Sequence, residues 1–168
     1  IALRIRRAVN AHPLGSKYFR VATPEDMIPA EFRASGLKDY GPPYSTWTDV
    51  IKAWDEDEFA LDPTRLTLVC GAAGFDGTQF KGLLADRFDI QINKTSRNSV
   101  LVQTNINNTH SDAALLIKAL VDLSREIDQN LAQGGRTAFD ARVKSLMTDV
   151  PDLPNFSRFH DAFRDQPK

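Results

Sequence analysis

LDPTRLTLVCGAAGFDGTQFKGLLADRFDIQINKTSRNSVLVQTNINNT, residues 61–109, is the stretch that decides the expected fold. Leu66, Leu68 and Cys70 alternate with side chains of the opposite face, which is the two-residue period of a β-strand. Residues 71–77 contain three glycines and predict a turn after this strand. The stretch therefore begins with a strand that has one apolar side.

A helix and two further strands are expected after the glycine turn. Thr78 is a suitable N-cap, and four apolar residues after it lie on one helical face. Ile90 and Ile92 indicate a short second strand. Residues 93–96 have the composition of a turn, and residues 100–106 are expected to form the third strand. Together these elements predict a compact module of mixed α+β class.

Residues 1–60 are expected to form an irregular lead-in, because short apolar pieces alternate with breakers such as the Gly-Pro-Pro turn at 41–43. Apolar residues at positions 1, 5 and 9 recur at a helical interval, so the chain is expected to begin inside a helix whose start is missing.

A second helix is expected near residues 45–54, where Ser45 or Thr46 can serve as the N-cap. Its two tryptophans, Trp47 and Trp54, share a face with two aliphatic residues at spacings of three and four. We interpret them as core or interface anchors rather than as an aromatic ligand platform. The acidic run that follows is unfavourable at a helix C-terminus and is expected to be a solvated loop.

The strongest helical pattern lies at residues 111–131, where Ser111 is the expected N-cap and five leucine or isoleucine side chains form a stripe. Gly134 and Gly135 end this helix, and a shorter amphipathic segment follows at 137–147. Two prolines then break the chain before three phenylalanines. The expected divisions are a lead-in at 1–60, a small α+β domain at 61–133, and the start of a helical C-terminal domain at 134–168.

The composition excludes several classes of partner. The 168 residues carry 21 basic and 22 acidic side chains, so the chain lacks the basic surplus that is typical of nucleic-acid binders. No apolar run approaches the ~18 residues that a membrane span needs, and residues 1–10 do not resemble a signal peptide. The single cysteine, Cys70, allows no disulfide within the chain and favours a reducing compartment. We expect a cytoplasmic protein with neither nucleic acid nor membrane as partner.

The sequence offers no catalytic, cofactor-binding or metal-binding constellation of its own. The glycine turn matches neither dinucleotide nor phosphate-loop spacing, and the carboxylate of Asp76 would repel an anion, so we interpret the turn as structural. His12, His110 and His160 are far apart and have no ligand at metal-binding spacing. No serine lies in a nucleophile elbow.

Residues 62–68, DPTRLTL, resemble the start of the small domain in bacterial ornithine/lysine/arginine decarboxylases. The resemblance continues in order through the glycine turn, the helix that contains residues 80–84, and the KTSRNS turn at 94–99. It also includes the strand at 100–106 and the long helix at 111–131. The succession of these motifs, more than any one of them, carries the resemblance.

This resemblance implies the C-terminal part of a fold-type I enzyme that depends on pyridoxal phosphate and decarboxylates ornithine, lysine or arginine to the corresponding amine. The implied fold is a small sheet of three or more strands packed with helices, and the implied assembly is a dimer or a group of dimers. In the family the lysine that binds the cofactor directly follows a histidine, and none of the eight lysines here does. The chain alone is therefore expected to be inactive and to bind no cofactor.

Arg97 is the one candidate for a site residue. It lies just before the third strand, roughly where related aminotransferases place an arginine that binds the substrate carboxylate through two parallel hydrogen bonds. The alternative for this residue is an ordinary surface arginine in a polar turn. The alternative for the whole chain is a non-catalytic interaction or regulatory module of the same fold, with the C-terminal aromatic residues as its partner surface.

Overall fold

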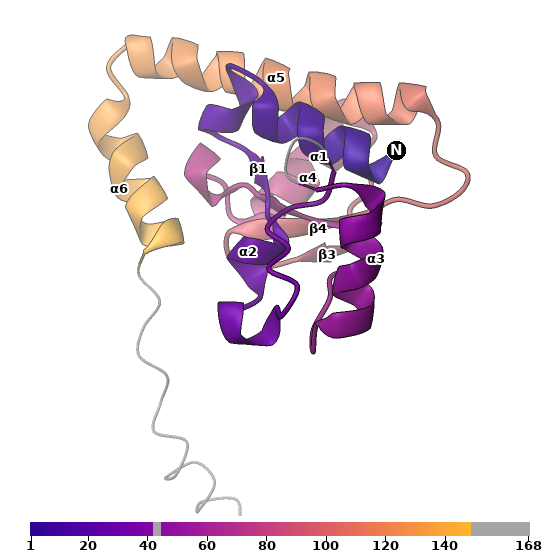
Figure 1. Ribbon diagram of the computed structural model, residues 1–168. Coiled ribbons are helices and arrows are strands. Elements are labelled where there is room, and N and C mark those ends of the chain that lie inside the picture. The colour runs from indigo at the N-terminus through magenta and orange to yellow at the C-terminus, as the bar shows by residue number, and fades with distance from the viewer. Residues whose placement is uncertain (42–44, 149–168) are drawn as a thin grey trace, which may run out of the picture.

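A computed structural model describes residues 1–41 and 45–148 of the chain (Figure 1). These residues form six α-helices and one four-stranded antiparallel sheet, so the expected α+β class is confirmed. The strands lie in the order β1 (Arg20–Val21), β2 (Arg65–Val69), β4 (Ser99–Gln103) and β3 (Lys94–Thr95). In the described part of the chain, no helix is both long enough and apolar enough to cross a membrane.

The two central strands confirm the alternating pattern on which the fold was predicted. Leu66 and Leu68 of β2 pair with Val102 and Val100 of β4, and Cys70 follows directly after β2. Leu66, Leu68 and Cys70 are each at most 1% exposed. β1 pairs with β2 although it comes from the segment before residue 61, so the sheet is built from both sides of that expected boundary.

Two helices pack against the sheet, α1 (Ala2–Ala11) and α4 (Gly77–Phe88), and α5 (His110–Ala132) packs against both of them. α5 runs across the molecule above α1 in Figure 1. Apolar side chains from all three helices and from β1, β2 and β4 form one continuous core. Phe80 of α4 lies in it fully buried, with its ring stacked 5.4 Å from that of Phe19 and 5.8 Å from that of Phe75.

The remaining helices are smaller and lie at the periphery. α2 (Pro24–Met27) and α3 (Trp47–Glu56) belong to the segment that follows β1. α6 (Arg136–Met147) follows α5 and packs against η3 (Gly71–Ala73), a single turn of 3₁₀-helix in the glycine turn. α6 falls at the expected start of the C-terminal domain. The three phenylalanines that follow it in the sequence lie outside the described residues, as does most of the Gly-Pro-Pro turn.

The face predicted for α3 is partly wrong. Val50 and Ala53 are its buried residues, and they pack with Leu37 and Tyr40 in a small separate cluster. Trp47 and Trp54 do not belong to the buried set of this cluster and are 56% and 45% exposed. They contact each other edge to face, with 6.0 Å between ring centroids, but they are not core residues. We therefore name the exposed set Trp47, Ile51 and Trp54 the tryptophan stripe.

Several predicted boundaries are also wrong, for identifiable reasons. The predicted strand at Ile90 and Ile92 does not form, and β3 lies at Lys94–Thr95 instead, inside the predicted turn. This strand exists because it pairs with Val100 and Leu101 of β4, a contact that local composition does not encode. The acidic run was predicted as a loop, but α3 continues to Glu56, whose carboxylate pairs with Lys52 one turn earlier.

Two helices, α4 and α5, begin two residues earlier than predicted. Asp76 caps α4 in place of Thr78, and Thr109 caps α5 in place of Ser111. Thr46, one of the two alternatives for α3, is its cap. Each cap forms a reciprocal capping box with the residue three positions later, and these two hydrogen bonds fix the first residue of the helix.

Candidate functional site

Arg97, the predicted site residue, lies in the tight turn between β3 and β4. The backbone of this turn is closed by a hydrogen bond of 2.8 Å from Ser96 N to Ser99 O. The Arg97 side chain is exposed. The turn therefore presents a guanidinium at the surface from a hydrogen-bonded backbone.

The glycine turn is hydrogen-bonded to the backbone of the Arg97 turn. The amides of Cys70 and Gly71 both donate to the carbonyl of Asn98, each at 2.9 Å, and the amide of Gly77 donates to the carbonyl of Ser96 at 3.1 Å. A Cβ atom on Gly77 would lie 2.2 Å from that same Ser96 oxygen, so no other residue fits there without moving the backbone. The glycines thus allow the two turns to lie in direct contact.

The start of α4 is occupied by the protein's own groups. Asp76 Oδ1 accepts a hydrogen bond of 2.9 Å from Gln79 N. Arg142 of α6 donates to Asp76 Oδ2 at 3.1 Å and to Gln79 Oε1 at 3.0 Å. These contacts give the glycine turn a structural role, because amides that an anion would need are already paired.

Arg97 itself binds the end of a helix. Its Nη2 donates to the backbone carbonyl of Ser145, in the last turn of α6. Among residues 1–41 and 45–148, no carboxylate lies within ion-pair distance of Arg97. Arg87 and Arg142, by contrast, are paired with Glu126 and Asp76. In the described structure, the guanidinium of Arg97 therefore contacts the negative end of the α6 dipole and no anionic side chain.

A shallow hollow of about 280 Å³ adjoins the Arg97 turn. It lies along β3 and β4, and Thr67, Lys94, Thr95, Ser96, Ser99, Val100 and Leu101 line it. Lys94 is exposed, and the described part of the chain provides no ion-pair partner for it. Arg97 is not one of the lining residues. The hydroxyl groups and the one ammonium group of this hollow are donors that suit a ligand with a carboxylate.

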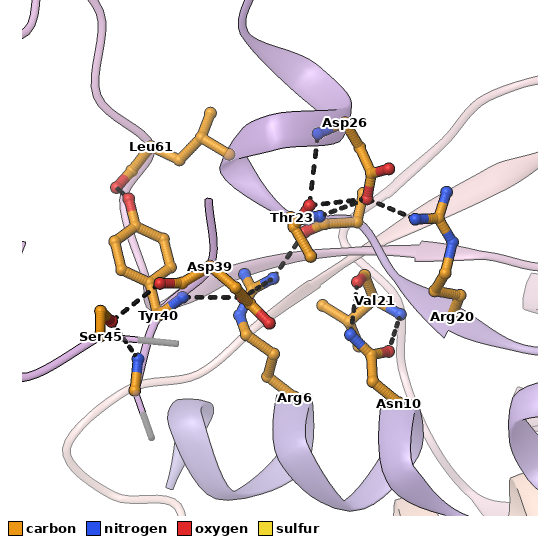
Figure 2. A network of polar contacts seen from close by, with 12 residues as sticks. Arg6, Asn10, Arg20, Val21, Thr23, Asp26, Asp39, Tyr40, Ser45 and Leu61 are labelled. Carbon is orange, nitrogen blue, oxygen red and sulfur yellow. Dashed lines mark hydrogen bonds and ion pairs between the residues drawn. The ribbon is translucent and has the colours of Figure 1, made fainter. Parts of the chain in front are cut away.

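A second polar cluster, which the sequence did not reveal, surrounds Arg6 (Figure 2). The Arg6 side chain is only 2% exposed, and its Nη1 donates to Ala22 O at 2.5 Å. The Asp39 carboxylate is 3.7 Å away, and the guanidinium lies 5.3 Å from the ring centroid of Tyr40. Burial lowers the pKa of Arg6 and raises that of Asp39. The cluster joins α1 to the segment before α3, and we interpret it as structural.

The two described histidines, His12 and His110, make their contacts elsewhere in the fold. His12 Nδ1 accepts hydrogen bonds from the amides of Leu14 and Gly15, and His110 contacts Arg4. His160 lies outside the described residues. In the part of the chain that the structure describes, no group of three or more His, Cys, Asp or Glu residues is placed to hold a metal ion.

Cys70 is a core residue, as the sequence indicated. It is 0% exposed, and burial raises its pKa to about 12. A thiol in this environment stays protonated at neutral pH and is not a nucleophile.

No family model, curated protein or solved structure matches this chain. The geometry around Arg97 and the sequence resemblance are therefore the basis for a function.

Proposed function

We propose that the chain is the small domain, with the start of the following domain, of a decarboxylase that depends on pyridoxal phosphate and acts on ornithine, lysine or arginine. In this proposal Arg97 binds the α-carboxylate of the amino acid. The resemblance of residues 62–68 and 94–99 supports the family, and the α+β fold is compatible with it.

The observation that carries the proposal is a guanidinium on a fixed turn, with no carboxylate partner among the described residues. A surface arginine gains little from being held in place, whereas an arginine that recognises a carboxylate needs a constant position. The hydrogen bonds from Cys70, Gly71 and Gly77 supply that constancy. In the described chain Arg97 has no carboxylate partner, and its one hydrogen-bond partner there is the neutral carbonyl of Ser145.

In this proposal the cofactor is held by residues outside the given chain. Pyridoxal phosphate supplies the electron sink for decarboxylation, and it is held by a lysine whose amine must be partly desolvated. None of the seven described lysines is buried, and four of them are in ion pairs with carboxylates. We therefore derive no step through the cofactor and place its binding in a large domain of the complete protein.

We further propose a cytoplasmic assembly of two or more copies. The single buried cysteine is compatible with a reducing compartment. The tryptophan stripe is an exposed apolar surface of the kind that subunit contacts cover.

The same stripe favours a second candidate, a non-catalytic interaction module. Trp47 also lines a hollow of about 410 Å³ together with Ile1, Leu3, Pro63 and Ile106, and the Ile106 side chain is fully exposed. An apolar hollow beside exposed indoles suits a protein partner as well as another subunit. Enzyme assays of the complete protein separate this candidate from the first.

The upstream reading frame provides the first test. The decarboxylase proposal requires a histidine-lysine pair within a large α/β domain, and an upstream sequence without this pair would refute it.

The second test measures carbon dioxide release from ornithine, lysine and arginine by the complete protein. We expect R97A to raise KM for the preferred amino acid about ten- to a hundredfold, because a charged hydrogen bond contributes roughly 1.5–3 kcal/mol. R87A is the matched control, since Arg87 is a surface arginine already paired with Glu126. Equal KM values for the two variants would contradict the role of Arg97.

A further inference from the structure

We infer that α6 regulates the proposed site by competing with the substrate carboxylate for Arg97. This inference rests on the proposed function, because it treats Arg97 as the carboxylate-binding residue. It concerns an additional event: the release of α6 from the Arg97 turn when the amino acid binds.

The contact between Arg97 and Ser145 imitates the contact that the substrate would make. The last carbonyl groups of a helix lack partners inside the helix and carry the negative end of its dipole, close to half an elementary charge. The Ser145 carbonyl belongs to this group and accepts a hydrogen bond from Arg97 Nη2. A full carboxylate is a stronger acceptor for the same guanidinium, and it can engage two of its donors at once.

The glycine turn is shaped to receive α6. A Cβ on Gly71 would lie 2.6 Å from the sulfur of Met147 and 2.7 Å from the Cβ of Asn98, so the end of α6 and the Arg97 turn both pack closely against this glycine. Asn98, next to Arg97, donates a long hydrogen bond of 3.9 Å to the same sulfur. The ring of Phe139 approaches Gly74 and contacts Tyr18 edge to face at 6.2 Å. The docked position of α6 is therefore a specific one.

Docking is nevertheless weak enough to be reversible. Of its twelve residues, all described, α6 buries Leu146, and most of its other side chains are exposed. Its link to α5 contains Gly134, whose φ of +107° is accessible to glycine and strained for other residues. A helix with little buried apolar surface and a glycine link is the type of element that opens locally at small cost. Figure 1 shows α6 at the margin of the fold, joined to the end of α5.

The site then has two states, of which the structure holds the docked one. In the docked state Arg97 is bound to Ser145, and in the released state its donors are free. A ligand that needs the released state binds with an apparent affinity reduced by the fraction of molecules in that state. Docking of α6 therefore raises KM for the amino acid, and any factor that stabilises docking inhibits the enzyme.

The test uses the complete enzyme with F139A and R142A, two variants that weaken docking without changing a residue that contacts Arg97. We expect each to lower KM by up to about tenfold, because a larger fraction of the molecules is then in the released state, with kcat unchanged. Combined with R97A, neither variant should lower KM further. Single variants that raise KM or leave it unchanged would overturn the inference, because α6 would then be a support for Arg97 or independent of it.

Hydrogen exchange of residues 136–147 gives a readout that does not depend on turnover. We expect α-methyl derivatives of ornithine, lysine and arginine, which keep the carboxylate, to speed exchange in α6 several-fold for the preferred side chain, and the matching amines to have no effect. Unchanged exchange with every derivative would refute the competition. Failure of the underlying proposal is distinguishable, since R97A would then leave KM unaltered, whereas failure of this inference alone leaves the KM effect of R97A intact.

Discussion

Replacement of Gly77 by alanine should separate the glycine turn from the Arg97 turn. The new Cβ would lie 2.2 Å from Ser96 O, 2.5 Å from Ser99 O and 2.9 Å from Ser96 N, and all three atoms are backbone. Ordinary contacts of a Cβ begin at 3.4 Å, so the two segments must move apart by about 1 Å. No side-chain rotation can relieve this clash.

The cost follows from these distances. Forcing extra atoms into closely packed structure costs typically 1–3 kcal/mol, and the hydrogen bond from Gly77 N to Ser96 O is weakened as well, which adds about 1 kcal/mol. Alanine in place of glycine returns roughly 0.5–1 kcal/mol by restricting the unfolded chain. We therefore expect G77A to lower the free energy of unfolding by about 1–3 kcal/mol.

G82A is the matched control, because Gly82 lies in the same helix and an added Cβ would meet nothing within 4 Å. It should stabilise the chain by about 0.5–1 kcal/mol. Urea denaturation followed by circular dichroism measures both variants, and their midpoints should move in opposite directions. If G77A proved as stable as G82A, the close approach of the two turns, and with it the fixed position of Arg97, would be refuted.

Three further expectations follow from the described contacts. F80A should lower the free energy of unfolding by about 3–5 kcal/mol, since Phe80 is fully buried between two other rings, and a loss below 1 kcal/mol in urea denaturation would contradict this packing. Cys70, with its pKa raised by burial to about 12, should resist iodoacetamide in the native protein at pH 8 and react in urea, so rapid native labelling would exclude a buried thiol. The hydrogen bonds from Arg87 lower the pKa of Glu126 below its ordinary 4.5. The pair therefore stabilises the fold above pH 4.5. This stabilisation is lost as the pH falls through the lowered pKa of Glu126. Carboxyl NMR titration should show the pKa of Glu126 rising in R87A, and an identical titration in both proteins would argue against the ion pair.

Local periodicity was sufficient to predict the long elements of the fold. Leu66 and Leu68 alternate in a strand of five residues, and the stripe of α5 contains five leucine or isoleucine side chains, so each element is encoded several times in its own sequence. β1 and β3 have two residues each and no period to detect. Their existence depends on pairing with β2 and β4, which a local pattern cannot show.

The starts of α4 and α5 carry a sequence signal of their own, the capping box. Asp76 precedes Gln79 by three positions and Thr109 precedes Asp112 by three, which is the spacing of a capping box. The candidate site is different, because Arg97 meets Ser145 across 48 residues of sequence. The burial of Arg6 could not be predicted from the sequence either. Arginine side chains are ordinarily exposed, whereas Arg6 is buried together with Ile5 and Val9 on one side of α1.

The shortness of the two outer strands has a consequence for the behaviour of the chain in concentrated solution. β1 and β3 form the edges of the sheet, and each offers two residues for pairing. Arg20 and Lys94 place a charge on each edge. Edges this short and charged give another chain too few hydrogen bonds to add a strand, so they protect the longer central strands from aggregation.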